Sequence, residues 1–295
     1  MPHKHIVGYL LDTVWAIYEP KAAEISAFIS HYINSGGAVP ENFAAAPRPS
    51  ARRAGAVAVL PVFGALYPRA NMMAEVSGGT SMQVFNAAFA EAVANPEVKA
   101  IVLDIDSPGG AVTGIPETVA HIMAAREDKY IVAVANNMAA SAAYWLGSAA
   151  NEFYVTPSGE VGSIGVLTMH QDFSKQLEEA GVKSTIIRAG KYKADRNPYE
   201  PLSDETKQSI QAAVDEYYNM FISAVAKGRG VPAATVRAGF GEGRMVLAKQ
   251  AVAENMVDGI ATLEEVLAKL GAGNGTVAVY NGSATRRQRL DLLSK

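Results

Sequence analysis

One apolar stretch, residues 131–150, constrains the fold of this chain more than any other part of its sequence. It begins with the β-branched run Ile131-Val132-Ala133-Val134 and continues into an alanine-rich segment from Met138 to Ala150. The stretch has about the length of a membrane span, but Asn136, Asn137 and two serines interrupt it. We therefore expect a buried strand followed by a buried helix, in a soluble and cytoplasmic protein.

Ser141 falls near the start of that expected helix, among residues too small to cover it. Backbone N–H groups at a helix start have no intrahelical acceptor and stabilise negative charge. A serine at such a position can act as a nucleophile whose intermediate those donors hold. Small residues with a serine are also common where two helices pack closely, so this stretch alone leaves both interpretations open.

The flanking sequence alternates apolar strands with amphipathic helices. This alternation predicts an α/β fold with a mostly parallel sheet covered on both faces. The expected strands are 57–62, 99–105, 131–135, 153–155 and 184–188, and the expected helices are 82–94, 116–125, 138–150, 173–180, one that follows Ser203, and two within 246–270.

Composition shifts divide the chain into four parts. We expect an N-terminal extension over residues 1–44, a linker rich in alanine, proline and arginine over 45–55, a main domain over 56–270, and a flexible basic tail over 271–295.

The totals exclude several functions. The net charge of −3 gives no indication of nucleic-acid binding. The absence of cysteine excludes disulfides, thiolate metal sites and a cysteine nucleophile. We see no cluster of metal-ligating residues and expect no cofactor.

Two further stretches carry candidate chemistry. Asp106-Ser-Pro-Gly-Gly110 follows an expected strand, where paired glycines let the backbone approach a ligand and supply N–H donors. Gly190-Lys-Tyr-Lys-Ala-Asp195 contains lysines, and a lysine acts as a general base once it is desolvated. An ordinary tight turn and a solvated surface lysine are the structural alternatives.

Taken in order, these stretches resemble the signal peptide peptidase A family of serine proteases, relatives of ClpP. The resemblance covers roughly residues 56–270 and includes Gly162-Ser-Ile-Gly-Val166 and Val257-Asp-Gly259. It implies a ClpP/crotonase-like βαβ superhelix and peptide hydrolysis by a Ser/Lys dyad.

The resemblance assigns roles residue by residue. Ser141 matches the nucleophile, and Lys193 matches the general base because two residues separate it from Gly190, which excludes Lys191. Gly109 and Gly110 match the oxyanion loop, with the Ala142 N–H as the second donor. Ser163 matches a serine that orients the lysine.

The N-terminal extension with Trp15-Ala16-Ile17 looks like the tailed-phage branch of this family, whose members trim scaffold, portal or coat proteins during head maturation. That resemblance implies a protein substrate, a homo-oligomer without a membrane anchor, and a location in the host cytoplasm or the phage prohead. The small residues around Ser141 predict cleavage after small or hydrophobic side chains, with the substrate bound as an added strand.

Four alternatives remain at this point. The chain is a signal-peptide or general protein-degrading peptidase of the same family, or a ClpP-like enzyme that uses His170 and Asp172 with Ser141. Otherwise it is a non-catalytic assembly scaffold, or a crotonase-like enzyme acting on acyl-CoA.

Overall fold

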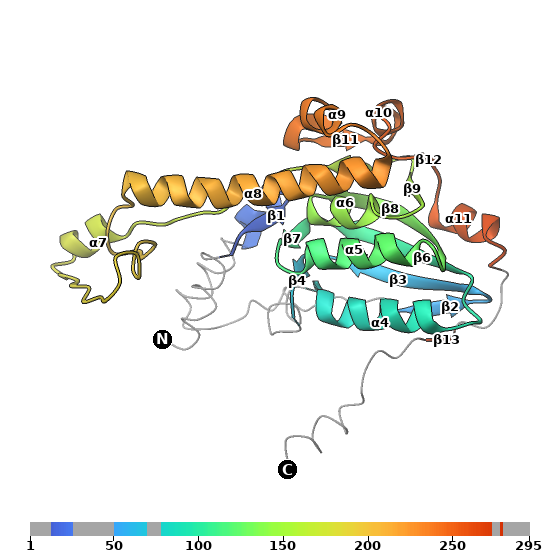
Figure 1. Cartoon of the computed structure of the whole chain (residues 1–295), viewed down its shortest axis with the longest axis horizontal. Helices are drawn as coiled ribbons and strands as arrows, with labels where there is room; N and C mark the ends of the chain where they lie inside the picture. Colours follow the sequence, from blue (N-terminus) through green and yellow to red (C-terminus); the bar gives the residue numbers. More distant parts are fainter. Residues whose placement is uncertain (1–12, 26–49, 70–77, 273–277, 280–295) are drawn as a thin grey trace, which may run out of the picture.

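The computed structural model describes residues 13–25, 50–69, 78–272 and 278–279. These residues form a mixed α/β fold whose main sheet is mostly parallel, as the sequence predicts (Figure 1). The predicted basic tail lies outside the described residues apart from its first and a few later positions, and so does most of the predicted N-terminal extension.

The main sheet runs in the order β11-β10-β8-β6-β3-β2-β13, with β9 paired to β8 and β12 paired to β9. The pairs among β3, β6, β8, β9, β10 and β12 are parallel, whereas β2, β11 and β13 pair antiparallel at the edges. Its strands are β2 (Arg52–Ala54), β3 (Val57–Phe63), β6 (Ala100–Ser107), β8 (Tyr130–Ala140), β9 (Glu152–Val155), β10 (Glu160–Gly162), β11 (Met245–Leu247), β12 (Gly259–Ile260) and β13 (Ala278–Val279).

Helices cover this sheet on both faces. The helices of the described chain are α4 (Met82–Ala94), α5 (Ile115–Ala125), α6 (Ala142–Gly147), α7 (Ser174–Glu179), α8 (Asp204–Arg229), α9 (Ala233–Ala238), α10 (Ala248–Ala253) and α11 (Leu263–Lys269), with the 3₁₀ turn η2 (Phe240–Gly243). Of these, α7 lies away from the sheet (Figure 1). Ser81 caps α4 and Ser203 caps α8, as expected from their positions before the apolar periodicity.

The strand side chains alternate between two apolar clusters because successive residues of a strand point to opposite faces. Leu60, Leu103 and Ile131 pack into the larger cluster, with α4, α5, α6 and the C-terminal half of α8. Val59 and Val102 point to the other face and pack against α11. Burial on both faces explains why these strands are continuously apolar in sequence.

A second, smaller sheet lies beside the carboxyl end of the main one. Its order is β1 (Trp15–Ile17), β7 (Gly109–Ala111), β4 (Leu66–Tyr67) and β5 (Thr80–Ser81). β1 comes from the predicted N-terminal extension, and the end of the predicted linker forms β2 of the main sheet. β1 and β2 thus join these two segments to the smaller and the main sheet.

An arm projects from this body (Figure 1). We use that name for residues 168–203, which contain α7 and lie along the N-terminal half of α8. The strand expected over 184–188 is wrong, since residues 182–188 have no regular structure and Ile187 is 95% exposed. In the arm this β-branched segment has no neighbouring strand, and a strand needs a partner for its backbone groups.

The apolar stretch 131–150 forms a longer strand and a shorter helix than predicted. β8 continues to Ala140, where residues 138–140 pair in parallel with β10, and α6 is limited to Ala142–Gly147. Alanine favours a helix, but the ladder to β10 overrides that preference. Within the described residues, no helix is both long and apolar enough to cross a bilayer.

Candidate active site

Ser141 stands at the junction between β8 and α6 (Figure 1 shows this junction in green). Its φ of 52° and ψ of −117° lie outside the ordinary regions for a residue with a side chain. Such a conformation costs on the order of 1–3 kcal/mol and persists only where surrounding contacts impose it. A sharp strand-to-helix turn of this kind is how several hydrolases present a nucleophilic serine.

Hydrogen bonds from both sides hold this turn. The Ser141 N–H donates to the Gly162 carbonyl (2.7 Å), and the Trp145 N–H donates to the Ser141 carbonyl (2.9 Å). The Ser141 hydroxyl donates weakly to the Gly165 carbonyl at 3.3 Å. Ser141 is fully buried in the described chain, so it meets substrate only where the segments above it separate or are themselves the substrate.

The Ala142 N–H lies directly after Ser141 in the chain and is a candidate oxyanion donor. It is the first N–H of α6, and no acceptor for it is found among the described residues. Ala142 is also fully buried, so the N–H lacks water as well. A buried donor without a partner beside a serine is suited to a negatively charged oxygen that forms only during reaction.

The glycine loop approaches the same point from β6. Gly109 has a φ of +90°, and a Cβ on it would lie 3.0 Å from the Ala142 nitrogen. A Cβ on Gly110 would lie 2.1 Å from the Leu66 carbonyl oxygen, because β7 runs against β4 there. The Ser107 hydroxyl fixes the loop by donating to the Gly64 carbonyl (2.7 Å) and accepting from the Gly109 N–H (3.2 Å). The structure therefore places Gly109, Gly110, Ser141 and Ala142 together, as expected.

Ser163 is adjacent to this group through the backbone. It follows Gly162, whose carbonyl accepts the Ser141 N–H, and it shares the φ of 52° found at Ser141. Its own N–H donates to the Arg244 carbonyl (2.8 Å), and its side chain is buried. This is a suitable position for orienting a base that arrives above Ser141.

Lys193 lies elsewhere in the single chain. It is exposed in the arm, in a turn closed by its N–H and the Gly190 carbonyl (3.2 Å), whereas Ser141 is buried in the body. Within the described residues its side chain makes no hydrogen bond or ion pair. One chain therefore does not bring the predicted nucleophile and base together.

Lys191 is held differently. Its ammonium donates to the Tyr192 hydroxyl (2.6 Å) and to the Glu205 carboxylate (3.0 Å). These hydrogen bonds, with the charge of Glu205, raise the pKa of Lys191 above its ordinary value. A lysine held as a cation is a poor base, which favours Lys193 as the base of this stretch.

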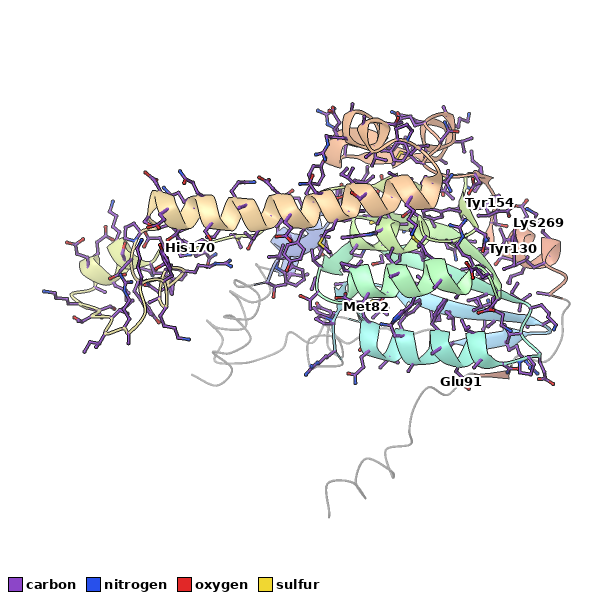
Figure 2. All side chains as sticks on the ribbon, viewed as in Figure 1. Met82, Glu91, Tyr130, Tyr154, His170 and Lys269 are labelled. Carbon is purple, nitrogen blue, oxygen red and sulfur yellow. The ribbon has the colours of Figure 1, made fainter. Side chains whose placement is uncertain are left out.

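The alternative base His170 also lies in the arm, beside α7 and away from α6 (Figure 2). Its Nε2 is buried without a partner. Asp172 accepts a hydrogen bond from the Ser174 N–H (2.8 Å) within the same loop. The single chain therefore does not bring His170 and Asp172 to Ser141 either.

Two acid–amide pairs support the site and were not expected. Asn136 donates to Asp104 (3.1 Å), and Asn137 donates to Asp106 (3.3 Å) across β8 and β6. Burial raises the pKa of both carboxyls, although the amides act in the opposite direction. Both pairs lie where the register between β6 and β8 shifts after Ile105, so the only indication in the sequence is the presence of polar residues at the ends of apolar strands.

Metal ligation has no support in the described part of the chain, where no group of three or more histidine, aspartate or glutamate side chains is arranged to hold an ion.

Comparison with known proteins agrees with this geometry. The family model described as peptidase family S49 matches residues 123–276, which is more than half of the chain. This chain belongs to peptidase family S49. The matched region contains Ser141, Ser163 and Lys193, while the glycine loop precedes it.

Several S49 relatives have names that describe phage or secretion proteins. The chain is 37% identical over 175 residues to capsid assembly protease C of Escherichia phage lambda, covering 59% of this chain and 40% of the relative. It is 38% identical over 175 residues to head-tail preconnector protein GP5 of Enterobacteria phage P21, covering 59% and 35%. It is 30% identical over 174 residues to a putative signal peptide peptidase SppA of Enterococcus faecium, covering 59% and 50%. The chain thus spans half or less of the length of these three relatives.

Proposed function

We propose that this chain is a serine endopeptidase that uses a Ser141/Lys193 dyad and processes the head proteins of a phage or prophage. The observation that carries the proposal is the convergence of Ser141, the unpaired Ala142 N–H and the Gly109–Gly110 loop at one buried point. The names of the two phage relatives support head proteins as substrates, and their identities exceed that of the signal peptide peptidase relative.

Each group then has a defined task. The Ser141 hydroxyl adds to the substrate carbonyl, and neutral Lys193 takes the hydroxyl proton and passes it to the departing amine. The Ala142 N–H and a glycine-loop N–H stabilise the negative oxygen of the tetrahedral intermediate. Water then hydrolyses the acyl-enzyme by the same proton transfers in reverse.

The exposed position of Lys193, away from the Ser141 of its own chain, supports a site shared between two copies of the chain. We propose that the arm seats against a neighbouring body and delivers Lys193 to the Ser141 of that copy. Burial in such an interface would favour the neutral amine that a base needs.

The exposed apolar residues of the arm support this assembly. Of the eleven large apolar side chains exposed in the described chain, six lie between residues 169 and 199. Apolar side chains gathered on one projecting segment indicate a surface that another protein covers. They are Met169, Phe173, Val182, Ile187, Tyr192 and Tyr199.

Subunit mixing tests the function and the assembly together. Ser141→Ala and Lys193→Ala should each lose at least about 10³-fold of the turnover of casein or of a phage coat or scaffold protein. Lys183→Ala, which removes another exposed lysine of the arm, is the matched control and should keep full activity.

An equal mixture of the two inactive variants should recover activity, up to about a quarter of the wild-type value, because that fraction of sites combines an intact serine with an intact lysine. No recovery from the mixture would rule out a shared site. Full activity of Lys193→Ala would rule out the dyad, and full activity of Ser141→Ala would rule out the proposed enzyme.

A further inference from the structure

The N-terminal strand β1 lies between two segments that border Ser141. On one side it pairs antiparallel with β7, the strand formed by the glycine loop, with Ala16 opposite Gly110. On the other side Trp15 and Leu167 exchange two backbone hydrogen bonds, each of 2.8 Å. Leu167 is two residues after Gly165, whose carbonyl accepts the Ser141 hydroxyl. β1 therefore lies as an extended peptide between the glycine-loop strand and the segment whose Gly165 carbonyl accepts the Ser141 hydroxyl.

The register brings one carbonyl of β1 to the proposed oxyanion donors. The Val112 N–H donates to the Val14 carbonyl (3.0 Å), and the Tyr18 N–H donates to the Pro108 carbonyl (2.7 Å). Because hydrogen-bonded pairs alternate along an antiparallel ladder, the intervening Ala16–Gly110 pair is also hydrogen-bonded. The Gly110 N–H thus faces the Ala16 carbonyl oxygen.

The Ala16 carbonyl oxygen and the Ala142 nitrogen both lie beside Gly109. A methyl-sized volume on Gly109 would contact the Ala16 carbonyl oxygen at 2.3 Å and the Ala142 nitrogen at 3.0 Å. The Ala16 carbonyl therefore faces the Gly110 N–H and lies beside the same glycine as the Ala142 N–H, the second donor of the proposed mechanism. No other carbonyl of β1 has this relation to the glycine loop and α6 in the contacts of these described residues.

The side chains of β1 point alternately to two sides, as those of a substrate bound as a strand would. Ala16 is fully buried and packs into the main core cluster, on the side of α6. Trp15 and Ile17 point the other way and pack with Ala65, Tyr67 and Ala111. The β1 side chain that enters the main core cluster is thus a methyl group, which agrees with the expected cleavage after small side chains.

We propose that β1 is the first substrate of this site, and that Ser141 hydrolyses the Ala16–Ile17 peptide bond of its own chain. This inference rests on the proposed function, since it uses the same nucleophile, donors and base. Cleavage removes residues 1–16 and leaves a new N-terminus at Ile17. It also breaks the strand that covers Ser141, so that another peptide can take its place.

The reaction balances with groups already assigned. The Ser141 oxygen bonds to the Ala16 carbonyl carbon, and its proton passes through Lys193 to the Ile17 nitrogen as the carbon–nitrogen bond breaks. Water then adds to the Ala16 ester, gives a proton through Lys193 back to the Ser141 oxygen, and releases the Ala16 carboxyl group.

Intact mass and N-terminal sequencing of the purified full chain test the proposal. The wild type should begin at Ile17, whereas Ser141→Ala should keep residues 1–16. Ala16→Glu should also keep its N-terminus, because a charged side chain does not fit a fully buried site, whereas Ala23→Glu in the exposed part of residues 19–25 should be cut like the wild type. Thermal melts of the same samples report whether each variant is folded, and casein turnover reports the activity of the wild type and Ala23→Glu.

Mixing separates cleavage within a chain from cleavage between chains. When Lys193→Ala is mixed with isotopically heavy Ser141→Ala, only the light Lys193→Ala chain should lose residues 1–16, because its β1 lies on its own intact serine. Loss of the segment from the heavy chain instead would overturn the intramolecular assignment.

Two further outcomes separate this inference from the proposed function. Wild-type protein that degrades casein but keeps residues 1–16, or that is cut at another bond, overturns the inference and leaves the proposed function intact. Wild-type protein that cuts neither casein nor itself, with Ser141 unlabelled by a fluorophosphonate, overturns both.

Discussion

Gly109 and Gly114 show whether a glycine is needed for its backbone conformation or because neighbouring atoms leave no room for a side chain. Both have a φ of +90°, but a Cβ on Gly109 would meet three backbone atoms within 3.0 Å, whereas a Cβ on Gly114 would meet nothing within 4 Å. An alanine at either position carries the same conformational cost, of the order of 1 kcal/mol. Only the alanine at position 109 intrudes on the space between β1 and α6.

We therefore predict that Gly109→Ala reduces peptide turnover by about 10²-fold or more, because its Cβ displaces the substrate carbonyl from the oxyanion donors, an effect comparable to losing one donor. Gly114→Ala should lower the thermal midpoint slightly and leave turnover within about twofold, in keeping with a strained turn far from reacting atoms. Steady-state kinetics and thermal melts of both variants provide the comparison. Equal losses of turnover would show that conformation, and not proximity, makes Gly109 necessary.

His170 distinguishes the two proposed bases at the residue scale. It lies in the arm and its Nε2 has no partner among the described residues. We predict that His170→Ala keeps turnover within about threefold of the wild type, since a residue that transfers no proton contributes only through packing. A loss comparable to that of Ser141→Ala would favour a serine–histidine site in place of the lysine dyad.

At the scale of elements, the contact between α6 and α8 determines where Ser141 is held. Trp145 stacks on Phe221 with ring centroids 4.4 Å apart, and a Cβ on Gly228 would lie 2.1 Å from the Ser148 carbonyl oxygen. The missing side chain at Gly228 thus lets α8 approach the end of the helix that begins at Ser141.

We predict that Gly228→Ala destabilises the protein by about 2 kcal/mol, because the strain of overpacking exceeds the roughly 1 kcal/mol that alanine gains over glycine in a helix. Ser223→Ala on the exposed side of α8 serves as the control and should change stability by less than about 0.5 kcal/mol. Chemical denaturation measures both. An increase in stability for Gly228→Ala would mean that the two helices separate without cost.

The sequence predicts a helix or strand correctly where its hydrophobic pattern agrees with the contacts that the segment makes in the fold. The alternation of buried side chains in β3 and β6 and the serine caps of α4 and α8 follow directly from the sequence. The boundary at Ser141 did not, because residues 138–140 join a ladder with β10 that lies more than twenty residues away in sequence. The segment 184–188 has strand composition but no strand beside it, which composition cannot reveal.

At the scale of the whole molecule, the candidate site was only partly predictable. Gly109, Gly110, Ser141 and Ala142 meet because parallel strands end at one edge of a sheet, which is a general rule. Trp15-Ala16-Ile17 was visible in the sequence as an apolar tripeptide, but its place against β7 depends on a contact across almost a hundred residues. In the proposed mechanism Lys193 reaches Ser141 only between two copies of the chain, and local sequence patterns do not predict a contact between copies.

The buried pair of Asp104 and Asn136 makes global stability depend on pH. Burial raises the pKa of Asp104 above its ordinary value of 3.8, so the folded chain holds that proton more tightly than the unfolded chain. Asp104 therefore imposes no penalty at pH values below 3.8, and the penalty grows as the pH rises through the folded pKa.

We predict that Asp104→Asn raises the melting temperature at pH 7 and has little effect at pH 3, since asparagine keeps an acceptor for Asn136 without a buried charge. Asp215→Asn, an exposed control on α8, should show no such trend. Melting temperatures of both variants between pH 3 and pH 8 test this. A stabilisation that is larger at pH 3 than at pH 7 would contradict the sign of the effect.

In the proposed enzyme, β1 also competes with other substrates for the site beside Ser141. A segment tethered to the site by its own chain is present there at an effective concentration in the millimolar range. A free peptide that binds with micromolar affinity therefore gains little access while β1 is attached, and a dilute protein is hardly cut at all. If Ser141 removes residues 1–16 as proposed, then before that step the protease acts only on proteins packed around it at comparable concentration. Local protein concentration, as well as recognition, then decides which protein it cleaves first.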